Sequence, residues 1–324
     1  YFLIKFISCL IAACKSFLAD IIFFICSTFK LSDFEKQIAA KMALDFRHFC
    51  AEKTNDQSKA AKRCLQPVTQ LPAALAEVVT TAGIGSVVLF AENLESNEQV
   101  IKLTDALQQA AVKSYSKQPL IISIDQEGGR VVRLPQATSF AGNMAIGSTY
   151  QAKGTHYATE VSTVIAKELK LLGFNNNYAP VVDVNTNAKN PVINTRSFGE
   201  NPQRVAELGA AAVNAFQKQD IMATLKHFPG HGDTHVDSHL GLPVVEHDLA
   251  TIEKNDIAPF QWAIEHSNPA MIMTAHIQYP ALDNSTIKKL VTLNSFLLSF
   301  IPDNSKTTNL SSYRSMFSLA LNKC

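Results

Sequence analysis

IMATLKHFPGHGDTHVDSH, residues 221–239, is an apolar run that leads into a loop rich in histidine. The run at 221–225 predicts a buried strand, because it is short and almost wholly apolar. Pro229 and the glycines that follow it exclude a helix from the loop. Functional side chains gather where strands end in loops, because the strand fixes the first residues and the loop can close over a ligand. The segment therefore predicts both a strand and a site at its end.

Four further apolar runs predict strands, and helical patterns lie between them. These runs cover residues 84–90, 120–124, 179–184 and 270–274. Apolar residues at spacings of three and four, together with Pro202 at a first-turn position, predict helices over 97–117, 155–172, from 202 onward and over 252–266. Strands that alternate with helices predict a parallel α/β architecture.

The histidines of the loop allow three interpretations. His227, His231, His235 and His239 recur at every fourth residue, a spacing that holds zinc on one face of a helix. The helix-breaking residues argue against a metal site. Asp237 lies two residues before His239 and can accept its ring N–H, which fixes the tautomer and raises its basicity, as a proton shuttle requires. The third interpretation is a polar loop whose histidines cap turns, and the residues alone do not exclude it.

Four segments carry a resemblance to a known family. They are KHFPGHGDT followed by DSH (226–239), ISIDQEGGRVVR (122–133), NNYAPVVDV (176–184) and NPVINTRSFG (190–199). Together they resemble glycoside hydrolase family 3, in its β-N-acetylglucosaminidase (NagZ-type) branch, over about residues 32–287. The resemblance implies a (β/α)8 barrel of the TIM type, which takes about 250 residues.

Five predicted strands supply about five of the eight strand–helix units, so the barrel is expected to be incomplete in this chain. The expected organisation is an apolar leader at 1–30, a partial barrel domain at 31–287 and an unmatched tail at 288–324. An open barrel leaves an edge strand unpaired, which predicts poor folding or aggregation of the chain on its own.

The resemblance also implies roles for individual side chains. Asp125 would accept hydrogen bonds from sugar hydroxyls, while Arg133 and Arg196 would clamp the substrate. Lys226 and His227 would bind the sugar from the end of the fourth predicted strand. Milder interpretations stay open, since Asp125 could be a strand-end cap and Arg196 a salt-bridge partner.

By the same resemblance, His239, oriented by Asp237, would protonate the leaving oxygen and later deprotonate water. Imidazole suits this role because it titrates near neutral pH without the help of burial. Asp183 lies in an apolar Val-Val-Asp-Val run and is expected to be a buried structural carboxylate. The implied activity is exo-acting release of terminal β-linked N-acetylglucosamine from chitin oligomers or peptidoglycan fragments, with phosphorolysis as a close variant. No metal and no cofactor are implied.

A retaining glycosidase needs a second carboxylate about 5 Å from the acid. The family places this nucleophile at the end of the strand that follows the one at 270–274. No Gly/Val-rich run ending in aspartate follows here, and Asp303, the only carboxylate after Asp283, has a turn-like context. The chain as written is therefore expected to lack its nucleophile. Two explanations are open: a frameshift or truncation near residue 286, or a non-catalytic sugar-binding remnant.

Composition excludes some functions and indicates a compartment. The chain of 324 residues has 29 Lys and Arg against 28 Asp and Glu, which gives no electrostatic footprint for nucleic acid. Lys5 followed by an apolar run up to Cys14 is similar to an export signal with a lipoprotein-type cysteine, so a membrane contact is expected only through an N-terminal anchor. Non-native sequence or a loosely packed helix is the alternative for this leader.

Two cysteines bear on the same question. Cys50 and Cys64 flank a polar stretch, which suits a disulfide in an oxidising compartment, although two unrelated thiols fit equally. The sequence therefore favours the periplasm or outer envelope of a bacterium over the cytoplasm.

Overall fold

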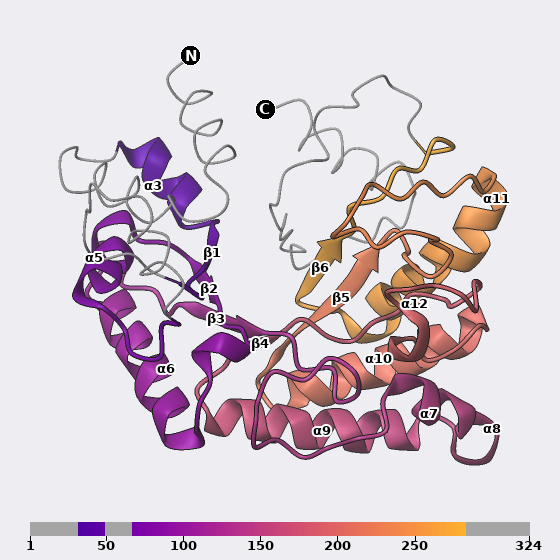
Figure 1. Cartoon of the computed structure of the whole chain (residues 1–324), viewed down its shortest axis with the longest axis horizontal. Helices are drawn as coiled ribbons and strands as arrows, with labels where there is room; N and C mark the ends of the chain where they lie inside the picture. The colour runs from indigo at the N-terminus through magenta and orange to yellow at the C-terminus, as the bar shows by residue number, and fades with distance from the viewer. Residues whose placement is uncertain (1–31, 49–66, 283–324) are drawn as a thin grey trace.

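The computed structural model describes residues 32–48 and 67–282, which form a curved parallel sheet with helices along its outer side (Figure 1). In the sheet each strand pairs in parallel with the next strand of the chain. The strands are β1 (Ala43–Asp45), β2 (Ser86–Val88), β3 (Ile121–Ile124), β4 (Asn176–Asn177), β5 (Met222–Phe228) and β6 (Met271–Thr274). This sequential parallel order confirms the predicted α/β class and the incomplete TIM-type barrel.

The connections between the strands are mostly helical. The helices are α3 (Asp33–Ala39), α5 (Ala73–Ala82), η1 (Ala91–Asn93), α6 (Asn97–Val112), α7 (Asn143–Ser148), α8 (Tyr150–Lys153), α9 (His156–Leu171), η2 (Asn194–Arg196), α10 (Pro202–Lys218), α11 (Leu249–Thr251), the π-helix η3 (Ile252–Ile257) and α12 (Ala258–Ser267). The Asn201 side chain accepts from the backbone N–H of Arg204, and Pro202 occupies the first turn, so α10 begins where the sequence predicts.

The strand predictions need two corrections. The described residues contain six strands rather than five, because β1 is a three-residue strand with only Leu44 buried and lacks an apolar run. The hydrogen-bonded strand predicted at 179–184 is instead β4, which ends at Asn177. Pro180 has no N–H to donate to a ladder, although Val181 still forms an isolated bridge with the next strand. Lys226 and His227 consequently belong to the fifth strand, not the fourth.

Helix boundaries and faces also differ in places. The helix predicted over 97–117 ends at Val112, and Tyr115, an apolar position of the predicted range, is 45% exposed. In α9 Tyr157 is 40% exposed, whereas Ile165 and Leu169 are buried. The helix predicted over 252–266 is α12 preceded by a π-helical turn. Periodicity therefore locates these helices, but their ends depend on local contacts.

The core lies between the sheet and the helices that cover its outer side. Residues of the strands at its centre, such as Ile122, Ile124 and Leu225, have no exposed surface. Helix α10 packs on both α9 and α12, with Val205, Leu208 and other apolar side chains turned inward. This packing fixes the strands, so the residues at their carboxyl ends have defined positions.

The two outermost described strands bear on the solubility of the chain. Within the part of the chain that the structure describes, β1 pairs only with β2 and β6 only with β5. Exposed edge strands promote pairing between molecules. We therefore predict that residues 1–324, expressed alone, aggregate or fold poorly in size-exclusion chromatography. A soluble monomer with a cooperative thermal transition would contradict this expectation.

Several predictions lie outside the described residues. These are the leader at 1–30, the pairing of Cys50 with Cys64, the tail at 288–324 and the context of Asp303. They stay predictions. Among the helices of the described ranges, none combines the length and the apolarity that a membrane crossing requires.

Candidate active site

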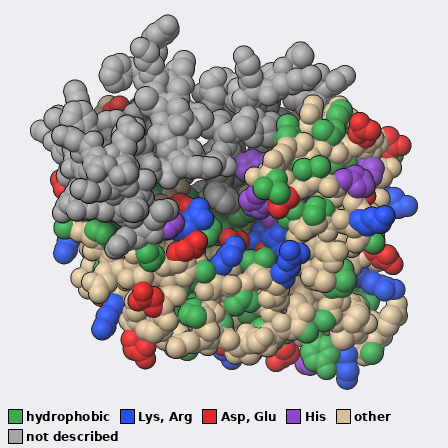
Figure 2. All heavy atoms as spheres, in the orientation of Figure 1, with side chains coloured by type: hydrophobic (Ala, Val, Ile, Leu, Met, Phe, Trp, Pro, Cys, Tyr) green, Lys and Arg blue, Asp and Glu red, His purple; other side chains and the backbone are tan. Residues whose placement is uncertain are grey.

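Charged side chains converge at the carboxyl ends of three neighbouring strands. Asp125 follows β3, Asp183 follows β4, and Lys226 lies near the carboxyl end of β5. In a parallel sheet these ends meet on one face, which is where barrel enzymes carry their sites. The space-filling view shows basic, acidic and histidine side chains close together around the centre of the molecule (Figure 2).

Lys226 is the buried centre of the first group of contacts. Its side chain is only 1% exposed, and its Nζ lies 2.7 Å from Asp125 Oδ1 and 2.7 Å from Glu127 Oε1. A buried ammonium group requires such partners, because desolvation without them costs several kcal/mol. Asp125 keeps 17% of its side chain exposed, so it is the member of this group that a ligand can reach.

Glu127 links Lys226 to an arginine. Arg196 makes a bidentate contact with Glu127: Nε donates to Oε2 at 2.9 Å and Nη2 donates to Oε1 at 2.7 Å. Burial raises the pKa of Glu127, but the charges of Lys226 and Arg196 lower it further, to about 2. Glu127 is therefore ionised, and it fixes the orientation of both cations.

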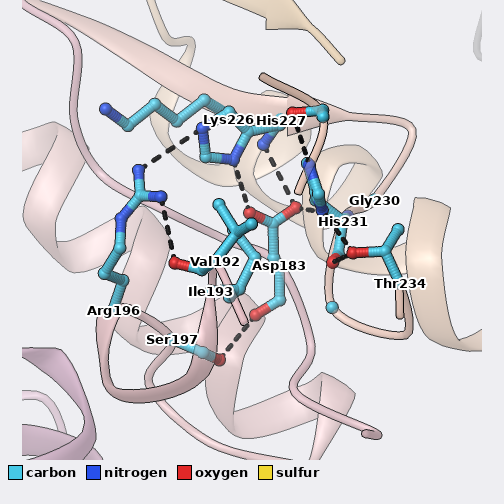
Figure 3. Close-up of polar contacts among 12 residues, drawn as sticks. Asp183, Val192, Ile193, Arg196, Ser197, Lys226, His227, Gly230, His231 and Thr234 are labelled. Carbon is cyan, nitrogen blue, oxygen red and sulfur yellow. Dashed lines mark hydrogen bonds and ion pairs between the residues drawn. The ribbon is translucent and has the colours of Figure 1, made fainter. Parts of the chain in front are cut away.

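Asp183 organises a second group of contacts, drawn in Figure 3. The side chain is fully buried, and its Oδ1 accepts from the backbone N–H of His231 at 2.7 Å and of His227 at 3.2 Å. Its Oδ2 lies 2.7 Å from His227 Nδ1. Burial raises the pKa of Asp183, but His227 and these hydrogen bonds lower it below its ordinary value. The prediction of a buried structural carboxylate agrees with this environment.

The two groups meet at His227. Its Nδ1 donates to Asp183, and its Nε2 lies 3.4 Å from Arg196 Nη2, a placement that suits a neutral ring with Nε2 as acceptor. Burial lowers the pKa of His227 to about 4 in spite of the neighbouring carboxylate. His227 is therefore uncharged at neutral pH, with Nε2 as a hydrogen-bond acceptor.

This low pKa predicts a pH dependence of stability. An unfolded histidine titrates near pH 6.5. Between about pH 6.5 and 4 this histidine is therefore protonated in the unfolded state but not in the folded state. The free energy of unfolding should fall by up to about 3 kcal/mol as the pH falls through this range. His227→Gln, made in the full-length encoded protein, should remove this pH dependence of the free energy of unfolding, as measured by urea titration. His266→Gln, at an exposed position, should retain it, and equal slopes in all three proteins would contradict the assignment.

His231 connects the strand end to the loop that follows. Its ring is buried, with Nδ1 2.7 Å from Thr234 Oγ1 and Nε2 3.0 Å from Ser238 Oγ. Gly232 allows the loop to pack against the chain that follows β4, since a Cβ at Gly232 would lie 1.7 Å from the carbonyl oxygen of Val184. These contacts fix the loop as far as Thr234, and the contact of Ser238 with His231 attaches the following residues to it.

Asp237 and His239 form the hydrogen bond that their spacing predicts. His239 Nδ1 lies 2.7 Å from Asp237 Oδ1, and the backbone N–H of His239 donates to the same oxygen at 2.9 Å. Burial raises the pKa of Asp237, but these two bonds lower it below its ordinary value. His239 presents 80% of its side chain to solvent with Nε2 free of this bond. The pair therefore has the contacts of a proton shuttle.

The structure joins some of the predicted site residues and separates others. Asp125, Arg196, Lys226 and His227 belong to one connected network. Among the residues that the structure describes, Asp237 and His239 are linked to this network through Ser238 and His231. Arg133 is outside the network. Its backbone N–H donates to Gln126 Oε1, and its buried Nε has no hydrogen-bond partner in the described ranges. Its predicted role as a substrate clamp stays a prediction.

Glu127 and His231 are the main residues that the sequence interpretation missed. Glu127 lies two residues after Asp125 at the same strand end, a spacing that could have indicated a shared side of the chain. No sequence pattern indicates that it pairs with both Lys226 and Arg196. Within residues 32–48 and 67–282, no group of three or more His, Cys, Asp or Glu side chains is arranged to hold a metal ion.

Comparison with known proteins identifies the family. The model of the glycosyl hydrolase family 3 N-terminal domain matches residues 57–301. Beta-hexosaminidase A of Pseudoalteromonas piscicida is 54% identical over 254 residues, which are 78% of this chain and 42% of that protein. A family 3 β-N-acetylglucosaminidase from Paenibacillus sp. str. FPU-7 superimposes with a TM-score of 0.68 at 36% identity, over 79% of this chain and 44% of its own.

NagZ from Neisseria gonorrhoeae, solved in complex with N-trifluoroacetyl-D-glucosamine, gives a TM-score of 0.64 at 29% identity, over 75% of this chain and 65% of its own. The chain thus spans less than two thirds of each of these relatives. The family model, the relatives and the partial parallel barrel agree with one another. The chain belongs to glycosyl hydrolase family 3, in its β-N-acetylglucosaminidase branch.

Proposed function

We propose that the protein is an exo-acting glycosidase that removes terminal β-linked N-acetylglucosamine from chitin oligomers or peptidoglycan fragments. The observation that carries the proposal is the charged network at the strand ends, where Lys226, Glu127 and Arg196 hold Asp125 at the surface of the site. Sugar hydroxyls bind well to fixed, charged acceptors and donors, because charge-assisted hydrogen bonds are stronger than neutral ones. The names of the relatives support the choice of sugar.

The mechanism that we propose is double displacement with retention. His239, oriented by Asp237, protonates the glycosidic oxygen and then deprotonates the water that releases the sugar. His227 and Arg196 bind and orient the sugar, since His227 is neutral and Arg196 is fixed by Glu127. The attacking carboxylate is expected at the end of a strand after β6.

Sugar binding without cleavage is the second candidate. It is favoured by the partners that three carboxylates of the described site already have. Glu127 and Asp183 are buried and fully engaged with their donors, and Asp125 is paired with Lys226, so none of these is placed as a free nucleophile. Phosphorolysis is a variant of the first candidate, because an acid/base histidine serves phosphate as well as water as the acceptor.

One experiment separates these functions. The coding DNA is resequenced from the codon for Ala270 past the stop and translated in all frames, and the encoded protein is then incubated with 4-nitrophenyl N-acetyl-β-D-glucosaminide, with and without phosphate. Release of N-acetylglucosamine supports the hydrolase, and its 1-phosphate supports the phosphorylase. Binding of N-acetylglucosamine in calorimetry without turnover supports the second candidate. The absence of both binding and turnover would contradict the proposal.

A further inference from the structure

The loop that carries Asp237 and His239 is fixed at both of its ends. At its start, the Tyr279 hydroxyl donates to the carbonyl oxygen of Gly230. Gly230 has φ of +155° and lies directly against Asp256, since a Cβ at this position would lie 2.8 Å from Asp256 Oδ1. The start of the loop is therefore packed on the π-helix η3 and on the segment after β6.

The end of the loop is attached to the same segment. The backbone N–H of Val245 donates to the carbonyl oxygen of Gln278 at 3.0 Å, and the N–H of Gln278 donates to Pro243 at 2.9 Å. A small apolar cluster underlies this pairing, with Val245, Ile252, Ile277 and Tyr279 buried. Between the two attachments, Leu240 is 87% exposed, so the middle of the loop projects from the surface.

His247 bridges the two ends. Its Nε2 lies 2.9 Å from Asp233 Oδ2, at the start of the loop, and its Nδ1 lies 3.5 Å from Asp256 Oδ2, on η3. Thr186 donates to the other oxygen of Asp233 at 3.0 Å, so both carboxylate oxygens of Asp233 have a partner. The ring therefore joins the beginning of the loop, its end and the helix beneath it.

Asp256 has few other partners. Its side chain is 2% exposed, and its Oδ2 makes no hydrogen bond in the described part of the chain. Burial raises the pKa of Asp256 to about 6, although His247 lowers it. The π-helical turn places this carboxylate towards the loop, and such turns recur at functional sites. His247 Nδ1 likewise makes no hydrogen bond among the described residues, so the two side chains are joined by the 3.5 Å ion-pair contact alone.

We propose that His247, held between Asp233 and Asp256, is a positioning residue for the acid/base His239. The contacts run from His247 to Asp233, which is next to Thr234, and from Thr234 through His231 to Ser238, the neighbour of His239. Loss of His247 releases the base of the loop and lets the Asp237–His239 pair move relative to the bound sugar. The proposal rests on the proposed function for its catalytic consequence, but not for the structural one.

Hydrogen–deuterium exchange and ¹⁵N NMR test the structural consequence without any need for turnover. In His247→Ala we expect amides of residues 231–239 to exchange at least about tenfold faster, because their opening is no longer opposed by the bridge. The ring nitrogens of His239 should shift towards values averaged over both tautomers. His247→Gln, whose amide still donates to Asp233, should recover part of both effects. His266→Ala, on the exposed side of α12, should change neither.

Kinetics test the catalytic consequence. With aryl N-acetyl-β-glucosaminides, His247→Ala should lose more kcat on poor leaving groups than on good ones, while the inhibition constant of N-acetylglucosamine stays within twofold. Asp233→Asn, which keeps the size of the side chain, gives the same comparison where His247→Ala does not fold. Unchanged exchange, an unchanged His239 spectrum, or equal losses for all leaving groups would overturn the proposal. An inactive parent protein would count against the proposed function, and the exchange and NMR results would still decide the role of His247.

Discussion

Replacing His239 with alanine is expected to lower kcat by about 10²–10⁴-fold on glycosides with poor leaving groups, measured with the protein as its gene encodes it. The expectation follows from the contact of Asp237 with Nδ1, which leaves Nε2 of an exposed ring available for proton transfer. Since His239 makes no direct contact with the sugar-binding network, the inhibition constant of N-acetylglucosamine should stay unchanged.

The leaving group provides the control for this assignment. A 2,4-dinitrophenyl glycoside needs little protonation on departure, so its cleavage should suffer much less in His239→Ala than that of a chitin oligomer. His235→Ala is the matched variant, because His235 is exposed on the same loop and its ring contacts Asn187. Equal losses in the two variants, or full activity in His239→Ala, would remove the acid/base role from His239.

Replacing Glu127 with alanine is expected to lower the free energy of unfolding by about 3–5 kcal/mol, the usual cost of leaving a buried charge without its partner. Two buried cations, Lys226 and Arg196, lose this carboxylate at once. Because Lys226 and Arg196 also orient Asp125 and His227, affinity for N-acetylglucosamine should fall with stability. Urea denaturation and calorimetry with the sugar measure the two effects.

The exposed Glu160 on α9 supplies the matched control, and Glu160→Ala should change stability by less than about 0.5 kcal/mol. A pH series adds a second check. The pKa of Glu127 is about 2 in the folded protein and near the ordinary glutamate value in the unfolded one, so its contribution is complete above about pH 4.5 and is lost as the pH falls towards 2. Glu127→Ala should therefore lose stability less steeply than the parent below pH 4.5. Equal stabilities at neutral pH would contradict the pairing.

Local pattern was sufficient for the main elements of the fold. The apolar run at 221–225 overlaps the first half of β5, and the periodicity of 155–172 corresponds closely to α9. The sequence pattern did not predict the strands correctly where burial and pairing do not follow from local composition. The short strand β1 has no apolar run, and Pro180 interrupts the ladder in a run that composition alone assigns to a strand.

The site was predictable in its residue types and only partly in its contacts. The spacing of Asp237 and His239 is sufficient to predict their hydrogen bond, because the two residues are close along the chain. The partners of Lys226 lie about a hundred positions earlier in the sequence, at Asp125 and Glu127. Such contacts require the strands to be placed side by side first.

The sequence by itself determined the alternation of strands and helices, the histidine-rich loop after residue 225 and the family motifs, because each depends on residues that are neighbours along the chain. Only the tertiary structure decided that Glu127 joins Lys226 to Arg196, that Asp183 holds the backbone of the loop, and that His247 bridges Asp233 and Asp256. These contacts exist because a parallel sheet brings the carboxyl ends of its strands to one face, where side chains far apart in sequence must neutralise one another away from water.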